Sequence, residues 1–366
     1  MPTDSDKGIR VLIVDDSFFM RKMLTEVLAD SGGAITVIDT AQNGLEAVEK
    51  NKKLKPDVIT MDVEMPQMDG LSALEAIMGE NPTSIIMLSS HTGKGTETTI
   101  RALEAGAFDC ALKPAGKPIG DIRGIQGELI EKIKLAARCR PKSRGAKAIR
   151  LIALPSKKLD SETKSPEKTT LPPKLARFLI AVGSSTGGPR ALNDFLSCFP
   201  AVLPAAVIIV QHITVGFTKA LARRLDEVSP LGVAEAEDGQ EIFEGRVYVA
   251  PAGRHLTIAG AKGFFQIALN DDPPRLGVRP SADIMMRSVA KAAGKETVGI
   301  VLTGMGKDGT EGLKEIRKAG GKTFAQDEES CVVYGMPKAA MEAGVVDKQM
   351  TLSQIVSHVT GLLANK

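Results

Sequence analysis

The sequence is poor in the residues that build metal clusters and disulfide frameworks. Its four cysteines, Cys110, Cys139, Cys198 and Cys331, are scattered along 366 residues and never form a C-x-x-C pair. This spacing indicates neither a zinc site nor a disulfide framework, and reduced thiols are typical of cytosolic proteins. The first residues, Met1–Lys7, are polar and lack an apolar signal core, so we expect the protein to be cytoplasmic.

The sequence also lacks a strong charge of either sign and any long apolar run. A net charge of +3 suggests neither nucleic acid nor an anionic membrane as a partner. No apolar run approaches the length of a bilayer span, so we expect no direct membrane insertion. What is present, 43% hydrophobic and 25% charged residues, is typical of globular proteins. A chain of 366 residues exceeds one ordinary core, so two domains are expected.

The first third of the chain, from about Ile9 to Ala137, alternates short apolar runs with amphipathic segments. Helical spacing occurs between the runs, for example in Phe19–Ala29 and Leu45–Lys50. The expected strands are Val11–Val14, Val37–Thr40, Val58–Met61, Ile85–Leu88 and Cys110–Leu112. This alternation predicts βα units around a parallel sheet that is buried between layers of helices.

A polar, breaker-rich stretch separates this region from a second one. Pro141–Gly145 and Ser161–Lys168 are poor in large apolar residues and predict a flexible linker, in which the apolar run Ile149–Leu154 could dock on a neighbour. From Leu175 the βα pattern returns, which predicts a second α/β domain. Its expected strands are Phe178–Val182, Ala205–Val210, Val247–Ala250, Val298–Leu302 and Lys322–Ala325, with a hairpin of Leu256–Ala259 and Phe264–Leu269.

In the first region, polar residues follow the ends of four expected strands. These residues are Asp15-Asp16, Asp62, Ser89 and Lys113. Because the carboxyl ends of parallel strands meet in one crevice, we expect all of them to face it. Clustered carboxylates repel one another unless a hard cation such as Mg²⁺ lies among them, and a lysine supplies a point charge for a phosphoryl oxygen.

These residues resemble those of the response-regulator receiver family over about residues 8–138. The resemblance implies a flavodoxin-like (βα)5 domain in which Asp62 is the phospho-acceptor. It further implies that Asp16, Asp62 and the backbone carbonyl of Glu64 hold Mg²⁺, and that Asp15 acts through water.

By the same resemblance, Ser89 and Lys113 would bind the phosphoryl oxygens, with Ser90 as the rival of Ser89. The chain departs from the family at one position. The family often has an aromatic residue three positions before the lysine, where this chain has Cys110, with Phe108 two residues earlier. The resemblance therefore predicts phosphorylation but leaves the aromatic switch open.

Three loops follow expected strands in the second region. They are Gly183–Gly188, Gln211-His212 and Thr303–Gly309. At the carboxyl ends of parallel strands they would bring a serine, a histidine and an aspartate into one crevice, which is the equipment for acyl transfer.

The first of these loops fits the pattern G-x-S-x-G, a sharp turn from strand to helix, and Pro189 suits the first turn of the helix. Backbone N–H groups at such a helix start stabilise developing negative charge. By itself a Gly/Ser turn is more often a phosphate cradle or a plain turn, and it leaves Ser184 and Ser185 both open. The order Ser, His, Asp disfavours the ordinary α/β-hydrolases, which run Ser, Asp/Glu, His.

The chain has only four histidines, so a general base can be sought by elimination. His91 lies in the first region, His358 lies in the C-terminal helical tail, and His255 begins a strand with a bland surface or core role. His212 alone follows a buried type of strand directly, which favours it as the base.

Two aspartates could orient the imidazole of this base. Asp308 lies at a strand end, although an Asp-Gly turn alone would explain it. Asp283 precedes a helix and could equally be an N-cap. The residues alone leave both open.

Read together, the motifs S-T-G-G, Q-H, R-P-S-A-D, L-T-G-M-G-K-D-G and C-V-V-Y-G-M-P closely resemble the chemotaxis methylesterase family, CheB. The resemblance implies a receiver at 8–138, a linker at 139–175, and a doubly wound, mostly parallel α/β catalytic domain at 176–366. It implies Ser185 as nucleophile, because this serine takes the family's position before Thr-Gly-Gly. It also implies that His212 is the base and acid, Asp308 the orienting carboxylate and the backbone amide of Met305 an oxyanion donor.

The function implied is that of a phosphorylation-activated, cytoplasmic serine hydrolase that serves sensory adaptation. It would demethylate glutamate γ-methyl esters and deamidate specific glutamines on methylated chemoreceptors, with a chemotaxis histidine kinase as phosphodonor. We expect a monomer that binds no nucleic acid and needs no cofactor for the esterase reaction. The alternative is a phospho-regulated binding module without catalysis. A transcription factor is disfavoured by the near-neutral charge and the absence of a helix-turn-helix pattern.

Overall fold

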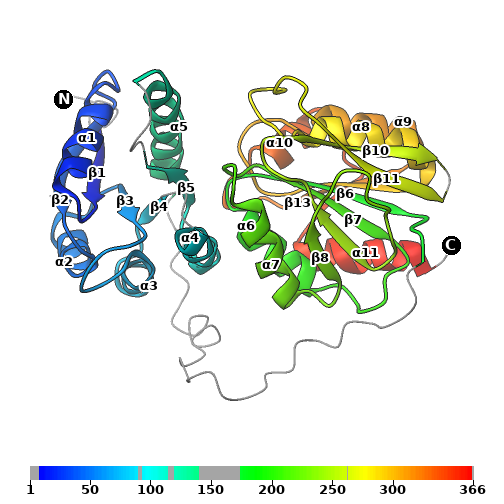
Figure 1. The fold of residues 1–366 in the computed structure, drawn as a ribbon, viewed down its shortest axis with the longest axis horizontal. Coiled ribbons are helices and arrows are strands. Elements are labelled where there is room, and N and C mark those ends of the chain that lie inside the picture. The colour runs from blue at the N-terminus through cyan, green and yellow to red at the C-terminus, as the bar shows by residue number, and fades with distance from the viewer. Residues whose placement is uncertain (1–7, 90–92, 114–118, 140–173, 262, 365–366) are drawn as a thin grey trace, which may run out of the picture. The chain divides into compact units, whose positions relative to one another are not determined.

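The computed structural model describes residues 8–89, 93–113, 119–139, 174–261 and 263–364 (Figure 1). The chain divides into two compact units between Glu162 and Thr163, and each unit is described by itself. The predicted linker falls almost wholly on residues 140–173, outside the described part, as does its apolar run Ile149–Leu154. The domain limits therefore remain a prediction.

The N-terminal unit is built on one parallel sheet in the strand order β2-β1-β3-β4-β5. The strands are β1 (Ile9–Val14), β2 (Ile35–Ala41), β3 (Val58–Asp62), β4 (Ser84–Ser89) and β5 (Asp109–Leu112). The helices are α1 (Phe18–Ala29), α2 (Gly44–Leu54), α3 (Gly70–Glu80), α4 (Gly93–Ala105) and α5 (Ile119–Arg138). This is the flavodoxin-like order, in which the strand sequence reverses between β1 and β3 and opens a crevice at that point. The predicted fold is confirmed.

The central strands of this unit are buried on both faces, which explains why they appear as apolar runs in the sequence. Val11–Val14 of β1 are fully buried, and all of β4 is buried, because helices cover both faces of the sheet. Figure 1 shows α1 and α5 on one face and α2, α3 and α4 on the other. Ser17, Asn43 and Asp69 cap α1, α2 and α3, each accepting a hydrogen bond from a backbone N–H of the first turn.

The C-terminal unit contains a seven-stranded sheet in the order β14-β13-β12-β6-β7-β9-β8, and every neighbouring pair is parallel. The strands are β6 (Leu179–Ser184), β7 (Ala206–Gln211), β8 (Gly232–Glu235), β9 (Arg246–Val249), β12 (Thr297–Val301), β13 (Lys322–Gln326) and β14 (Lys348–Met350). A separate antiparallel hairpin pairs β10 (His255–Ala261) with β11 (Phe264–Asn270). The prediction of a mostly parallel, doubly wound sheet is confirmed.

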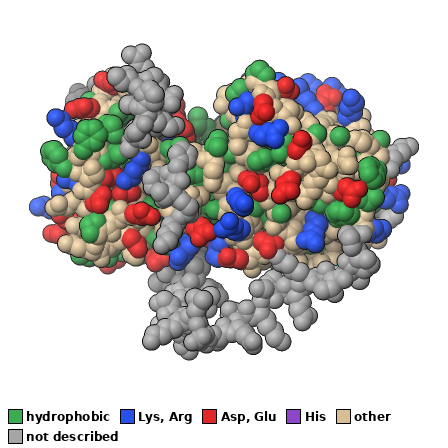
Figure 2. Space-filling view, in the orientation of Figure 1, with side chains coloured by type: hydrophobic (Ala, Val, Ile, Leu, Met, Phe, Trp, Pro, Cys, Tyr) green, Lys and Arg blue, Asp and Glu red, His purple; other side chains and the backbone are tan. Residues whose placement is uncertain are grey.

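Helices cover both faces of this larger sheet. They are α6 (Gly188–Ser197), α7 (Thr218–Val228), α8 (Ala282–Ala293), α9 (Thr310–Lys318), α10 (Met336–Glu342) and α11 (Leu352–Ala364), with a short 3₁₀ turn at Gly294–Glu296. Figure 1 shows α8, α9 and α10 on one face and α6, α7 and α11 on the other. None of the helices in the described ranges is both long and apolar enough to cross a membrane. Figure 2 shows acidic and basic side chains interspersed over the visible face of this unit.

Strands β12, β6 and β7 are neighbours in the middle of this sheet. The loops that follow them therefore emerge side by side, as predicted. The strands extend further than the sequence suggested, because β6 includes Gly183 and Ser184 and β7 includes Gln211. The serine turn thus begins at Ser185, and the histidine loop begins at His212.

Candidate phosphorylation site and candidate active site

In the N-terminal unit, Asp15, Asp62 and Lys113 form a compact charged cluster at the strand ends. The Lys113 Nζ lies 2.8 Å from Asp15 Oδ2 and 2.7 Å from Asp62 Oδ2. Asp15 is fully buried and Asp62 is 4% exposed. Asp16, which is exposed, offers a third carboxylate, and one ligand atom from each of the three aspartates lies within 4.8 Å of the others.

The loop that carries Asp15 and Asp16 is held by its own helix. Asp15 Oδ1 accepts a hydrogen bond from the Ser17 backbone N–H (2.9 Å). The Arg21 guanidinium, one turn into α1, donates to the carbonyls of Asp15 (2.7 Å) and Asp16 (3.0 Å). This role of Arg21 could not be predicted from the sequence, because a single arginine on an amphipathic helix normally faces solvent.

The charges of this cluster do not balance. Burial raises the pKa of Asp62 to about 6, although the Lys113 ammonium acts in the opposite direction. Burial would lower the pKa of Lys113, but its hydrogen bonds to Asp15 and Asp62 raise the pKa overall. One ammonium thus faces two buried carboxylates and a third nearby.

The donor set of this cluster fits Mg²⁺. That ion takes oxygen ligands and is usually bound through one or two carboxylates together with waters and phosphate oxygens. Asp15, Asp16 and Asp62 supply carboxylate oxygens with excess negative charge. Within the described residues, the carbonyl of Glu64 accepts no hydrogen bond, so its oxygen is free to act as a ligand.

The remaining predicted residues of this site lie at the ends of β4 and β5. Ser89 is 1% exposed at the end of β4, and its carbonyl accepts a hydrogen bond from the Lys113 N–H (3.0 Å). Ser90 lies outside the described residues, so the choice between the two serines stays open. Cys110 and Phe108 are both buried, and burial raises the pKa of the Cys110 thiol to about 12.

In the C-terminal unit, the structure separates the two candidate serines. Ser184 is fully buried, and its Oγ donates to Gln211 Oε1 (2.6 Å) on the neighbouring strand. Ser185 is half-buried and begins the turn, where its carbonyl accepts hydrogen bonds from Gly188 N (2.7 Å) and Gln211 Nε2 (2.8 Å). Ser184 is therefore a structural residue of the sheet, and Ser185 is the more accessible of the two serines.

Two glycines of this turn region have no room for a side chain. A Cβ on Gly188 would lie 1.9 Å from Gln211 Oε1. A Cβ on Gly304 would lie 2.7 Å from the Cβ of Ser185, so the loop after β12 passes directly against the serine. The next residue in that loop, Met305, is 47% exposed, and its backbone N–H has no acceptor within the described residues.

His212 and Asp308 are joined by a hydrogen bond of 2.9 Å between Nε2 and Oδ2. The register of β6 and β7 pairs Ser184 with Gln211, which puts His212 beside Ser185 at the same level of the sheet. Among the described residues, neither Ser185 Oγ nor His212 Nδ1 has a hydrogen-bond partner. The structure thus joins the histidine to the aspartate and leaves the serine–histidine bond unmade, which is common in free enzymes.

The carboxylate of Asp308 is 3% exposed and lies at the start of α8. It accepts hydrogen bonds from Ser281 Oγ (2.7 Å), Ala282 N (2.6 Å) and Asp283 N (3.1 Å) in addition to His212. Burial opposes ionisation, but the hydrogen bonds from His212, Ser281 and Asp283 lower the pKa of Asp308 overall. An ionised carboxylate only accepts, so His212 Nε2 carries a proton and Nδ1 is the basic nitrogen.

The rival aspartate, Asp283, has a different task. Its Oδ1 accepts from Gly309 N (2.9 Å) and Gly312 N (2.8 Å), and its Oδ2 pairs with Arg275 Nε (3.1 Å). It therefore caps the start of α9, whereas Ser281 is the N-cap of α8. The expectation that Asp283 could cap the helix it precedes is wrong, because it lies inside the first turn of α8 and reaches across to the next helix.

Of the other histidines, His255 and His358 lie within the described residues, and both have contacts that do not involve Ser185. His255 is fully buried, accepts at Nδ1 from Ser281 N (3.1 Å) and donates from Nε2 to the carbonyl of Pro273 (3.2 Å). His358 packs edge-on against Phe324, with ring centroids 5.3 Å apart. His91 lies outside the described residues.

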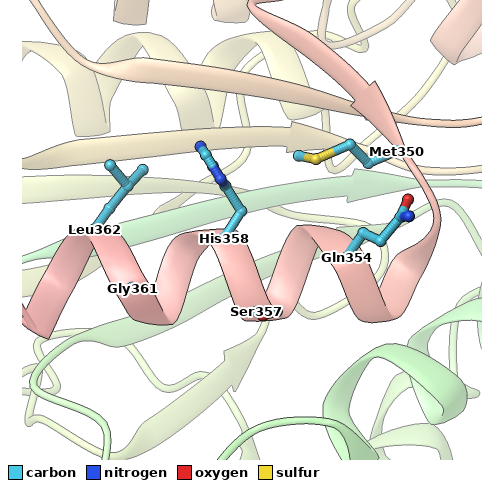
Figure 3. A pocket seen from close by; sticks show the side chains of 6 residues that line it. All are labelled: Met350, Gln354, Ser357, His358, Gly361 and Leu362. Atoms are coloured by element: carbon cyan, nitrogen blue, oxygen red, sulfur yellow. The ribbon is translucent and has the colours of Figure 1, made fainter.

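A cavity of about 600 Å³ lies along α11, and neither Ser185, His212 nor Asp308 lines it (Figure 3). Its lining residues are Met350, Gln354, Ser357, His358, Gly361 and Leu362. Ser357 and His358 are adjacent on the helix and point in different directions, so they do not form a nucleophile–base pair. The cavity therefore offers no second hydrolytic site.

Two family models match the chain, one in each unit. The model of the response regulator receiver domain matches residues 11–119, and the model of the CheB methylesterase matches residues 180–359. The latter range contains Ser185, His212 and Asp308, and the former contains Asp15, Asp62 and Lys113.

Proteins of similar length are similar over nearly the whole chain. A protein of Symbiobacterium thermophilum is 44% identical over 354 residues, which cover 97% of each chain. One of Pyrococcus abyssi is 44% identical over 359 residues, covering 98% of this chain and 94% of the relative. Both are named protein-glutamate methylesterase/protein-glutamine glutaminase. The crystal structure of the Thermotoga maritima CheB methylesterase catalytic domain is 40% identical and covers 51% of this chain and all of that one, with a TM-score of 0.50.

Proposed function

The chain belongs to the CheB methylesterase family and carries a response-regulator receiver domain, and we propose from this that it is a phosphorylation-activated hydrolase of glutamate γ-methyl esters. Its substrates are methylated chemoreceptors, and it also deamidates particular receptor glutamines. The observation that carries the proposal is the hydrogen bond between His212 and the buried Asp308, beside the Ser185 turn.

The first half of the reaction follows from the protonation states of the site. His212 takes the Ser185 proton at Nδ1, and the serine Oγ attacks the ester carbonyl. The imidazolium that forms is stabilised by Asp308, which already accepts the Nε2 proton. The Met305 N–H is a donor for the negative oxygen of the tetrahedral intermediate.

The second half reverses these roles. His212 gives its proton to the leaving methoxide, and methanol departs from the acyl-enzyme. A water molecule then loses a proton to His212 and attacks the acyl carbon, which releases the glutamate side chain and restores Ser185. With a glutamine substrate the leaving group is ammonia, which needs the same proton from His212.

In the receiver, a carboxylate oxygen of Asp62 attacks the phosphorus of the phosphodonor. The bond from phosphorus to the donor breaks, the dephosphorylated donor leaves, and Asp62 becomes an aspartyl phosphate. Asp16, Asp62 and the Glu64 carbonyl would hold Mg²⁺, with Asp15 acting through water. When bound, the ion would neutralise charge on the phosphoryl oxygens. Lys113 binds one of these oxygens, and Ser89, with Ser90 as its rival, binds another.

Methanol release from methylated receptor membranes tests the proposal. We expect release with the purified protein and a higher rate after a small-molecule phosphodonor and Mg²⁺ are added. Asp62→Asn should lose the increase, and Ser185→Ala should lose the activity itself. Binding to receptor membranes without any methanol release would contradict the esterase proposal and support the binding module instead.

A further inference from the structure

His255 lies two hydrogen bonds away from the carboxylate that orients the base. It is fully buried at the start of β10, and its Nδ1 accepts the backbone N–H of Ser281 (3.1 Å). Its Nε2 donates to the carbonyl of Pro273 (3.2 Å), so the ring is neutral with one proton on Nε2. The ring thus links Ser281 to Pro273, which lies in the chain segment before Ser281.

Ser281 connects this histidine to the active site. Its backbone N–H goes to His255, whereas its Oγ donates to Asp308 Oδ1 (2.7 Å). The same Oγ accepts from Ile284 N (3.4 Å) as the N-cap of α8. A shift of the Ser281 backbone would therefore move a donor of Asp308 and the start of α8 together.

Residues 281–283, the segment that His255 anchors, form hydrogen bonds with Asp308 and with the residue that follows it. Residues 281–283 supply three of the hydrogen bonds that the Asp308 carboxylate accepts. The Asp283 carboxylate in turn accepts the N–H of Gly309, the residue that follows Asp308. The direction in which Asp308 faces His212 is thus set by the place of this segment, and His255 fixes that place from the buried side.

We propose that His255 is a positioning residue of the esterase, acting through Ser281 to keep the Asp308 carboxylate in line with His212. It does not touch the substrate. This inference rests on the proposed function, because it assigns Asp308 and His212 their roles in ester hydrolysis. An apolar side chain could fill the same buried space but would leave the Ser281 N–H without its acceptor.

The test compares His255→Leu with His255→Asn in the full chain, with methanol release from methylated receptor membranes as the assay. The leucine removes the acceptor, and the asparagine returns an oxygen near the place of Nδ1. We expect His255→Leu to lower kcat by about tenfold to a hundredfold, as a small misplacement of a reacting group does, with KM nearly unchanged. His255→Asn should recover most of this loss. In proton NMR spectra, the signal of the His212 Nε2 proton should shift in the leucine variant and return in the asparagine variant.

His358→Asn serves as the matched control, because it makes the same exchange at a histidine outside this network. Should His255→Leu fail to fold, Ser281→Ala replaces it, since it removes the donor to Asp308 and keeps the backbone N–H for His255. A folded His255→Leu or Ser281→Ala variant with wild-type kcat and an unchanged proton signal overturns the inference. An equal loss in the leucine and asparagine variants with KM rising in parallel also overturns it, because that is the result of disturbed packing. If Ser185→Ala releases methanol at the wild-type rate, the proposed function fails, whatever His255 does.

Discussion

Both units bury a carboxylate at the carboxyl ends of parallel strands, but the two carboxylates are held in opposite ways. Asp62 shares one ammonium with Asp15, and burial raises its pKa to about 6. Asp308 accepts four hydrogen bonds, three of them from residues 281–283 at the start of α8, and its pKa is lowered. The difference lies in the donors, since both groups are almost completely buried.

This contrast matches two kinds of chemistry. A carboxylate with few hydrogen-bond donors, such as Asp62, can still bind a cation and accept a phosphoryl group. One that is fully hydrogen-bonded stays ionised and fixed, which suits a group that orients an imidazole and does not itself react.

The largest expected effect separates the two serines at the end of β6. Ser185→Ala should lower kcat for methanol release by about 10⁶-fold, because it removes the acyl-enzyme route. Ser184→Ala removes only the hydrogen bond to Gln211 and should cost far less. Rates are compared on methylated receptor membranes, and phosphorylation of Asp62 should be unaffected in both variants. A Ser184 variant that is the more damaged of the two would reverse the assignment.

Asp308→Asn should have the next largest effect, a loss of about 10⁴-fold in kcat. The amide can donate to His212 and so favours the wrong tautomer of the imidazole. Asp194→Asn, at an exposed position on α6, is the matched control for the substitution itself. A loss below about tenfold in kcat would show that the orienting group lies elsewhere.

Removal of divalent metal distinguishes the two sites directly. Chelation of Mg²⁺ should slow phosphorylation of Asp62 by a small-molecule donor by about a hundredfold, because several kcal/mol of charge stabilisation are lost. Basal methanol release by the unphosphorylated protein should not change. Incorporated phosphate and released methanol are measured in the same samples. Loss of basal esterase activity on chelation would show that the esterase site in the C-terminal unit also needs a metal ion, which would contradict this prediction.

The central strands and the loops at their ends could be predicted from the sequence, because strands covered by helices on both faces appear as continuous apolar runs. The edge strands β8 and β14 were missed, since they are short and partly exposed. Prediction of the candidate residues themselves depended on motifs that are local in sequence.

The supporting contacts could not be predicted in this way. Gln211 meets Ser184 from 27 residues away, and His255 meets Ser281 from 26 residues away. Asp283 shows the same limit, because its partners Gly309 and Gly312 lie 26 and 29 residues further along the chain. The first pair depends on the register of β6 and β7, and the pairs of Ser281 and Asp283 depend on how α8 packs between the hairpin and the sheet. No periodicity in the sequence records either arrangement.

The smallest expected effect is on stability and has opposite signs at the two carboxylates. A pKa raised from 3.8 to about 6 means that the folded N-terminal unit is destabilised whenever Asp62 is ionised. In metal-free buffer at pH 7, Asp62→Asn should therefore stabilise this unit, by on the order of 1–3 kcal/mol. The gain should shrink as the pH falls below about 6 and vanish below 3.8, where the wild-type carboxyl is protonated in both the folded and the unfolded state.

Asp308→Asn should instead destabilise the C-terminal unit at pH 7, since a lowered pKa stabilises the folded state above the usual range of the carboxyl. Urea unfolding of both variants across this pH range measures the two signs, and equal signs at pH 7 would remove the contrast between the two carboxylates.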